Sequence, residues 1–463
     1  MIQAFRNIFN IPELRNRVLF TLAMLGVYRI GAHIPTPGID TAAMQTFFES
    51  QAGGILGFVD MFSGGAFSRL TIFALGIMPY ITASIILQLL TVVWPYLEKL
   101  SKEGEAGRKK ITQYTRYGTV ALSLVQSFTI ALWLQSTSLG AGTGQIVLNP
   151  GLGFQLMTML TLTTGTAFIM WIGEQISERG IGNGISLIIY AGIVVGLPNA
   201  IANTIQDLQS GQIDLFVVLI IIAMMILVVA AIVFVERAQR RLPIQYARRV
   251  VGRRVYGGAS TYLPLRVNTA GVIPVIFASS VLAIPTTMGQ MGALRDVGWV
   301  QALVNQLQYS ALLYNLIYAI MIMFFCFFYV SIIFNPMDQA DNMKKYGGFI
   351  PGIRPGKKTA EHIDRILTRL TFGGAIYLAS ISLLPVLLTS GFQVAPLPWI
   401  GEFLDRWLPS FITQGLNVKF FFGGTSLLIV VGVAMDTVQQ IESQLIMRHY
   451  DGFLKGTRLK PRR

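Results

Sequence analysis

The side chains that most often perform catalysis or bind metals are few in this sequence and stand far apart. The three histidines are His33, His362 and His449, and the single cysteine is Cys326. Metal centres and nucleophilic active sites need several such groups at fixed spacing, and the sequence contains neither an HExxH nor a GxSxG motif. One cysteine also excludes a disulfide within the chain. We therefore predict no catalytic residue, no metal site and no cofactor.

Ionisable residues are also almost absent from the middle of the apolar segments. Arg29, Glu174 and Asp436 stand near the ends of such segments, where pairing or reaching toward the membrane surface keeps a charge solvated. Ion-coupled transporters usually place carboxylates, histidines or arginines near the bilayer centre, because those groups bind or relay charge. The pattern therefore argues against a secondary transporter. Together with the missing catalytic motifs, it argues against an intramembrane enzyme.

The apolar segments themselves indicate an all-α polytopic membrane protein. The chain has 463 residues, of which 53% are hydrophobic and only 13% are charged. A bilayer core about 30 Å thick requires about 20 apolar residues per helix. Ten segments approach that length: 18–34, 71–94, 115–136, 154–173, 183–203, 213–235, 268–288, 312–334, 371–389 and 418–440.

The distribution of basic residues tests this assignment, because Lys and Arg gather in cytoplasmic loops. The chain has 36 of them and a formal net charge of +14. Alternate loops and the two ends hold all but Arg29, Arg69, Arg295, Arg406 and Lys419. This asymmetry favours ten spans with both termini in the cytoplasm.

Two of the basic loops, 236–268 and 335–370, are longer than a simple connection requires. The first contains two candidate β segments around a Gly-Gly turn, and the second contains the sequence GIRPGKK. A topology signal or attraction to anionic lipids would need only a few charges. We therefore interpret these loops as ordered docking surfaces for ribosomal RNA or an acidic protein face. Their candidate docking residues are Arg240, Arg241, Arg248, Arg249, Arg253, Arg254, Arg354, Lys357 and Lys358.

Several long motifs closely resemble those of the SecY family, the channel-forming subunits of bacterial protein translocases. They occupy residues 61–90, 173–186, 270–280, 334–356 and 421–436. The resemblance implies two inverted, pseudo-symmetric halves of five helices each around a central pore. The halves would be residues 18–203 and 204–440, preceded by an interfacial helix over 1–17 and followed by a basic tail over 441–463. Such a channel passes unfolded secretory polypeptides and releases transmembrane segments sideways into lipid.

The resemblance also implies a plug, a short re-entrant helix over 62–73 that closes the outer funnel. Its candidate residues are Ser63, Gly64, Gly65, Ala66, Phe67, Ser68 and Arg69. The two glycines permit tight turning, and Ser63 and Arg69 suit a lipid-facing helix poorly. We expect a weakly anchored plug helix, with the second span starting near Ala74. An ordinary external loop before an intact helix is the alternative.

A polypeptide pore also needs a constriction that excludes water and ions. Branched aliphatic side chains dewet a narrow pore while they deform around a passing chain. Matching the family pattern gives six pore-ring candidates: Ile77, Ile81, Ile185, Ile189, Ile276 and Ile429. Members of the first two pairs stand four residues apart, hence on one helix face.

The family pattern places a lateral gate between the second and seventh spans. Pro79 and Pro274 remove backbone hydrogen bonds there and permit kinking. Gln88 on one side and Asn268, Ser279 and Ser280 on the other could hydrogen-bond across the closed seam. Packing within a helix bundle explains the same residues equally well.

Partners follow from what the sequence lacks and from the resemblance. No GxxxxGK[ST] motif is present, so the driving force must come from outside the chain. The resemblance implies the motor ATPase SecA or a ribosome at the cytoplasmic loops, and the small membrane subunits SecE and SecG beside the channel. It also implies a bacterial cytoplasmic membrane location, with signal peptides and anionic lipids as further partners.

Overall fold

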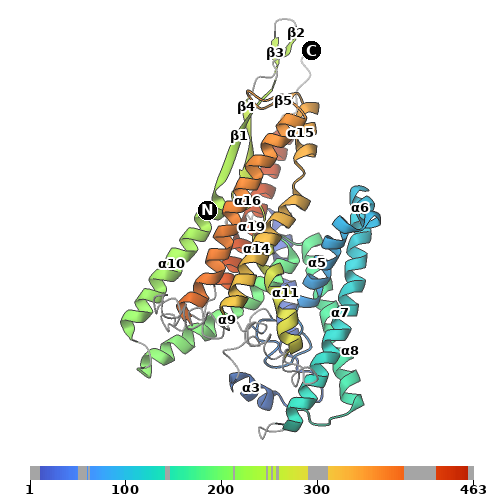
Figure 1. Cartoon of the computed structure of the whole chain (residues 1–463), viewed down its shortest axis with the longest axis vertical. Helices are drawn as coiled ribbons and strands as arrows, with labels where there is room; N and C mark the ends of the chain where they lie inside the picture. The colour runs from blue at the N-terminus through green and yellow to red at the C-terminus, as the bar shows by residue number, and fades with distance from the viewer. Residues whose placement is uncertain are drawn as a thin grey trace, which may run out of the picture. The chain divides into compact units, whose positions relative to one another are not determined.

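The structure is a computed structural model. It describes residues 11–50, 60, 63–140, 146–211, 214–246, 249–251, 254–256, 260–289, 311–389 and 424–456. Most of these residues are helical (Figure 1). The helices are α2 (Pro12–Gly31), α3 (Thr41–Ser50), α5 (Met78–Val93), α6 (Pro95–Lys102), α7 (Glu105–Gly140), α8 (Leu152–Arg179), α9 (Gly184–Gln209), α10 (Leu215–Arg237), α11 (Ile273–Gly289), α14 (Leu312–Ile333), α15 (Pro336–Lys345), α16 (Lys357–Thr389) and α19 (Gly424–Gly456). The strands are β1 (Gln239–Tyr246), β2 (Arg249–Val251), β3 (Arg254–Tyr256), β4 (Ser260–Arg266) and β5 (Gly348–Phe349).

Six helical stretches of the described chain are long and apolar enough to cross a membrane, so the protein is a multi-pass membrane protein. They are Glu105–Gln135, Leu152–Arg179, Gly184–Gln209, Leu215–Arg237, Leu312–Lys345 and Lys357–Leu384. The bent pair α5 and α6 raises the number to seven if it counts as one span.

Each of the ten expected segments overlaps a helix, but α2, α11 and α19 do not meet the same test within the described residues. In α2 the reason is charge, because Glu13, Arg15 and Arg17 occupy its first turns. The helix is also continuous from Pro12. Residues 12–17 were expected to belong to a separate interfacial helix over 1–17, but they form the first turns of α2. Residues 1–10 of that expected helix lie outside the described residues. Ten spans in two inverted halves remain a prediction.

The bend between α5 and α6 has a local cause. Pro95 lacks a backbone N–H and pushes the preceding residue away from helical angles. Trp94 accordingly adopts φ −99° and ψ 114°, and the two helices meet at 98°. The short α6 then buries Leu97 and Leu100 and carries Lys99 and Lys102 in its last turn.

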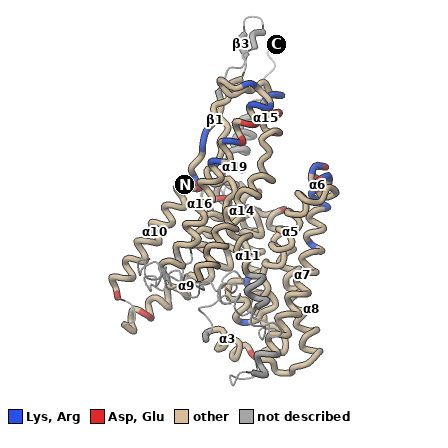
Figure 2. Tube along the Cα trace, in the orientation of Figure 1, with Lys and Arg blue, Asp and Glu red and all other residues tan. Residues whose placement is uncertain are grey.

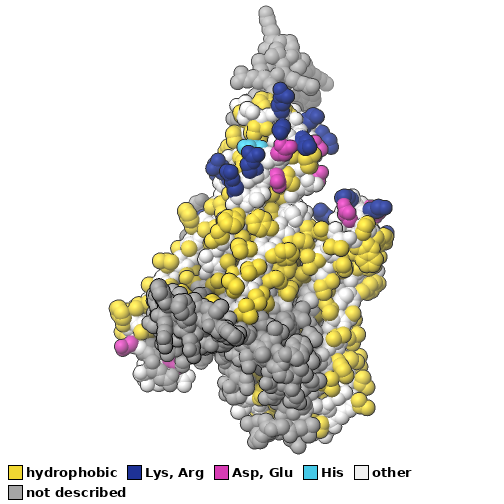
Figure 3. Space-filling model, viewed as in Figure 1, with side chains coloured by type: hydrophobic (Ala, Val, Ile, Leu, Met, Phe, Trp, Pro, Cys, Tyr) yellow, Lys and Arg dark blue, Asp and Glu magenta, His cyan; other side chains and the backbone are white. Residues whose placement is uncertain are grey.

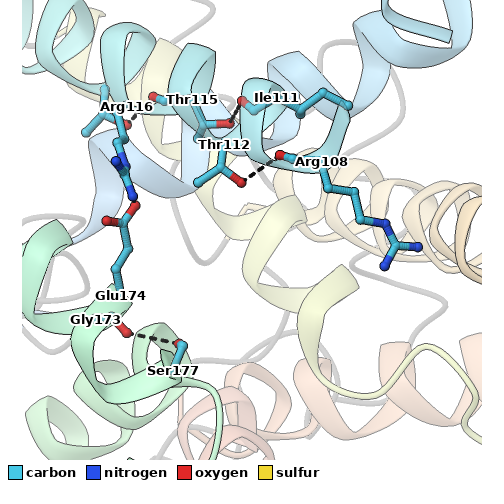
Figure 4. A network of polar contacts seen from close by, with 9 residues as sticks. Arg108, Ile111, Thr112, Thr115, Arg116, Gly173, Glu174 and Ser177 are labelled. Carbon is cyan, nitrogen blue, oxygen red and sulfur yellow. Dashed lines mark hydrogen bonds and ion pairs between the residues drawn. The ribbon is translucent and has the colours of Figure 1, made fainter. Parts of the chain in front are cut away.

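The described residues divide into two compact units. The first unit contains the residues up to 211, together with 283–289 and 433–456, and the second contains 214–282, 311–389 and 424–432. In the first unit an apolar core joins α3, α7 and α8 to the residues before α5. An ion pair of 2.8 Å between Arg116 on α7 and Glu174 on α8 links these two helices (Figure 4). This ion pair confirms that Glu174, near the end of an apolar segment, is paired with an opposite charge.

The second unit carries a three-stranded antiparallel sheet in the order β4-β1-β5. Strand β4 pairs along its whole length with β1, from Gln239 opposite Arg266 to Gln245 opposite Ser260. Along β1, Leu242 and Ile244 point inward and their neighbours outward, as the period of two in a half-buried strand requires. The inward residues pack against Met343, Ile350 and Ile363 of the second basic loop and α16. The two basic loops therefore form one folded body, which the sequence did not indicate.

Candidate channel-lining and docking sites

Residues 63–77 lead into α5, and we call them the turn segment. Residues 64–77 form turns and bends with a bridge at Thr71, so the helix expected over 62–73 is wrong for residues 64–73; Ser63 is helical, and Phe62 lies outside the described residues. Gly64, Gly65 and Gly76 have φ values of +68°, +80° and +56°, which glycine adopts without the strain of a Cβ atom. These conformations interrupt a right-handed helix and favour turns.

The helix after the turn segment begins at Met78 rather than near Ala74. Pro79 stands in its first turn, where the missing N–H has no intrahelical partner to lose. Pro274 stands in the same place in α11, which starts at Ile273. Both prolines therefore begin helices, and the expectation that they kink them is wrong.

The turn segment is deeply buried within the first unit, contrary to the expected weak anchoring. Ala66, Leu70 and Thr71 are fully buried, and Phe67 and Leu75 are nearly so. An antiparallel bridge between Pro35 and Thr71 ties the segment to the residues that follow α2. Releasing it would expose a large part of the unit's apolar core.

The pore-ring candidates of the first unit lie on the start of α5 and on α9. Ile77, Ile81 and Ile189 are buried, with exposed fractions of 4%, 3% and 2%. The Ile81 N–H donates to the Ile77 carbonyl at 3.1 Å, which confirms that these two residues stand one helical turn apart. Ile185 is half-buried and lies against Gly173 of α8.

The remaining candidates lie in the second unit. Ile276 on α11 and Ile429 on α19 are both buried. The two helices approach closely beside them, since a Cβ atom on Gly432 would meet Val272 Cγ1 at 2.5 Å. Val272 lies four residues before Ile276, and Gly432 lies three residues after Ile429. A single ring of all six isoleucines stays a prediction.

The four lateral-gate candidates all make hydrogen bonds within their own unit. Gln88 donates to Ser84 Oγ at 3.4 Å, and Ser279 and Ser280 donate to the Ile276 carbonyl at 2.9 and 2.8 Å. Asn268 lies before α11 rather than within it. Its Nδ2 donates to Glu236 Oε1 at 2.6 Å and to the Gly271 carbonyl at 3.1 Å. Hydrogen bonding across a seam therefore stays a prediction for these residues.

The candidate docking surface lies on the sheet and the start of α16. Figure 2 shows Lys and Arg concentrated over β1 and around α15, and Figure 3 shows their side chains on the same part of the second unit. Arg240 and Arg241 are exposed on β1, and the Arg241 guanidinium lies 5.2 Å from the ring centre of Tyr262 on β4. Stacking of this kind holds the cation at a fixed position.

The other docking candidates differ in how far the structure describes them. Lys357 and Lys358 are exposed in the first turn of α16, and Arg354 is exposed three residues before that helix. Lys358 pairs with Glu361 at 3.1 Å. Arg248 and Arg253 lie outside the described residues. The side chains of Arg249 and Arg254 do as well, although their backbones form β2 and β3.

Residues 71–438 match the family model described as SecY. The chain belongs to the SecY family. It is 49% identical over 449 residues to the protein translocase subunit SecY of Escherichia coli strain K12, covering 97% of this chain and 95% of that protein. It is 48% identical to the protein of the same name from Streptomyces coelicolor, covering 98% and 100% of the two chains.

Solved structures similar to this SecY family member show the same fold. One is described as the structure of a protein-conducting channel, with a TM-score of 0.62, 17% identity and coverage of 93% and 92% of the two chains. Another is Sec61 in the canine ribosome-channel complex from the endoplasmic reticulum, with a TM-score of 0.59, 17% identity and the same coverage. A third, described as a SecY structure in which the plug domain stabilises the closed state of the translocation channel, has a TM-score of 0.60 at 20% identity, covering 93% of this chain and 92% of that one.

Three polar contacts near these sites were not predicted from the sequence. Tyr28 and Arg29, at the end of α2, bind carbonyl oxygens of the turn segment. Glu236 is 8% exposed, and its carboxylate accepts a hydrogen bond from the Asn268 side chain. A lone charged residue beside the end of an apolar segment was the only sequence signal for Arg29 and Glu236, and that signal does not identify a partner.

Proposed function

We propose that the chain forms the protein-conducting channel of a bacterial protein translocase. It passes unfolded secretory polypeptides across the membrane and releases transmembrane segments sideways into lipid. The observation that carries this proposal is the 49% identity, over 97% of the chain, to the protein translocase subunit SecY of Escherichia coli. The family conducts proteins and performs no covalent catalysis, so the energy for transport comes from partners.

The buried isoleucines support a mechanism for the seal. A narrow column of water between branched aliphatic side chains loses hydrogen bonds, so ions do not cross it. We propose that Ile77, Ile81, Ile185, Ile189, Ile276 and Ile429 form this constriction. The turn segment serves as the plug on its outer side, in keeping with the similar SecY structure in which the plug domain stabilises the closed state and maintains a membrane seal.

The exposed basic surface supports docking of cytoplasmic partners. We propose that the sheet and the start of α16 bind a ribosome or the motor ATPase SecA, and that SecE and SecG lie beside the helices. The chain would reside in the bacterial cytoplasmic membrane with both termini inside. Ribosome binding has a parallel in the canine Sec61 channel, which forms a ribosome-channel complex.

Reconstitution tests the channel proposal directly. The purified complex is placed in liposomes with a motor ATPase, ATP and an unfolded secretory protein, and protease-protected protein is measured. We expect ATP-dependent protection. Its absence with correctly inserted complex would contradict the proposal.

A charge reversal tests the docking surface separately. Arg354→Glu should reduce motor-driven transport at least tenfold without affecting insertion, because it replaces a cation on the exposed surface. Arg369→Glu, an equally exposed change farther along α16, is the matched control. Equal transport by both variants would remove Arg354 from the docking surface.

A further inference from the structure

Two consecutive side chains of α2 bind two consecutive carbonyl groups of the turn segment. The Tyr28 hydroxyl donates to the Ser63 carbonyl at 3.2 Å, and Arg29 Nη1 donates to the Gly64 carbonyl at 2.9 Å. Tyr28 is 1% exposed and stacks on Phe73, with ring centres 5.9 Å apart. The end of α2 therefore holds the turn segment both at its start and at Phe73.

Hydrogen bonds within the turn also hold its residues together. Asp60 Oδ1 accepts the Ser68 N–H at 2.8 Å and the Ser63 hydroxyl at 3.2 Å. The Ser63 hydroxyl oxygen in turn accepts the Phe67 N–H at 3.0 Å. Because these bonds fix residues 63–68 as one small body, a pull on Ser63 or Gly64 moves all of it.

The opposite side of this small body rests on α9. A Cβ atom on Gly64 would lie 2.8 Å from Gly192 Cα, so the two backbones touch. Gly192 itself has no Cβ atom, which permits this close approach of the two backbones. Gly192 lies three residues, almost one helical turn, beyond the ring candidate Ile189. The contact places the turn next to the proposed constriction within the first unit.

We propose that Tyr28 and Arg29 are positioning residues that hold the turn at Ser63 and Gly64 against α9, and that opening the channel requires their two hydrogen bonds to break. The inference rests on the proposed function, because it takes the turn segment as the plug. Arg29 contributes more than Tyr28, since a hydrogen bond from a charged donor is stronger than one from a neutral donor.

Cysteine labelling measures how often the turn leaves its seat. Ala66 is 0% exposed and its side chain makes none of these bonds, so Ala66→Cys reports release of the turn, and Cys326→Ser removes the native thiol. Arg29→Met should raise the labelling rate and the ion leak of the complete complex in lipid about tenfold or more. Tyr28→Phe should raise them about fivefold, because it keeps the ring stacked on Phe73 and removes only the hydroxyl. Arg17→Met is the matched control, since Arg17 lies in the first half of α2 and pairs with Glu13 at 3.5 Å.

Deletion of residues 63–69 separates this inference from the proposed function. If the deletion leaks but neither Arg29→Met nor Tyr28→Phe changes labelling, the positioning role is wrong and the plug assignment stands. If the inserted deletion variant seals like the wild type, the plug assignment is wrong and the positioning role with it. Combining Arg29→Met with the deletion should add no leak, because the group that Arg29 holds is gone. A full additional increase would show that Arg29 acts elsewhere and would overturn the inference.

Discussion

Asn268 Nδ2 donates to Glu236 Oε1 over 2.6 Å, and this bond joins the last turn of α10 to the residues between β4 and α11. Both residues are buried, with exposed fractions of 3% for Asn268 and 8% for Glu236. Beside them the Val267 N–H donates to the Ala238 carbonyl at 3.0 Å. These two bonds therefore hold the ends of β1 and β4 nearest the membrane helices to the end of α10 and to the residues before α11.

Removing the amide should destabilise this junction. Asn268→Ala removes the amide that donates a hydrogen bond to the buried Glu236 carboxylate, which should lower the free energy of unfolding by about 2 kcal/mol. Thr269→Ala is the matched control, because the Thr269 hydroxyl donates to the Arg266 carbonyl at 2.8 Å in an exposed place. Denaturant unfolding of the purified complex in detergent measures both variants. Equal losses would mean that the Glu236 contact contributes no more than a surface hydrogen bond.

Two neighbouring glycines allow the contact between the turn segment and α9 to be measured alone. Gly64→Ala and Gly65→Ala both place a Cβ at positive φ, which costs about 1–2 kcal/mol. Only the Cβ at position 64 meets another backbone, at Gly192, whereas the one at position 65 has open space. Displacing that backbone should cost about 1–3 kcal/mol more, which is the usual cost of forcing extra atoms into a packed core. Gly64→Ala should therefore leak markedly more than Gly65→Ala in planar bilayers, and equal leaks would contradict the close contact.

The sequence predicted the periodic features of the fold and missed those that depend on distant pairing. Apolar runs located every helix that meets the span test, because about 20 apolar residues in a row have few soluble alternatives. The pairing of β1 with β5 was not foreseen, since β5 is only Gly348 and Phe349 and has no periodicity of its own.

The candidate site shows the same division. The resemblance to the SecY family pointed to Ile77 and Ile81, and their spacing of four residues placed them on one helix face; both are buried. The turn segment was misjudged as a helix, because positive φ values at glycines depend on what the backbone touches. The partners of Arg29 and Glu236 are carbonyl and amide groups far away in the sequence, and composition does not identify them.

Protonation of Asp60 at low pH should stabilise the closed position of the turn segment, in which Ser63 and Gly64 are bound to α2; we call this the seated state. Burial is the main cause that raises the pKa of this carboxyl above its ordinary 3.8, and the hydrogen bonds from Ser68 and Ser63 oppose the rise. Its titratable neighbour on α2 is Tyr28, with Arg29 beside it. A raised pKa in the seated state means that this state binds a proton more tightly than the released, solvated state. Seating is thus strengthened as pH falls through the raised pKa and reaches its limit below 3.8.

The measurement is the leak of the closed complex in planar bilayers as the pH on one side is lowered. We expect the leak to fall with pH in the wild type. Asp60→Asn, which is neutral at every pH, should show a low leak without that dependence. A wild-type leak that rises on acidification, or an unchanged dependence in Asp60→Asn, would contradict the role of this carboxyl.

Polarity rather than volume at position 276 should control the proposed seal. Ile276 is 4% exposed, and the hydroxyls of Ser279 and Ser280 bond its backbone carbonyl, so those bonds survive a change of side chain. Ile276→Asn offers hydrogen bonds to water and should wet the constriction, whereas Ile276→Leu keeps volume and apolarity and should conduct like the wild type. If Ile276 only filled the core, Asn would cost about 1–3 kcal/mol of stability without opening an ion path. Single-channel recording on inserted variants distinguishes these cases: a leak with Asn alone supports the dewetting seal, and equal behaviour of Asn and Leu refutes it for Ile276.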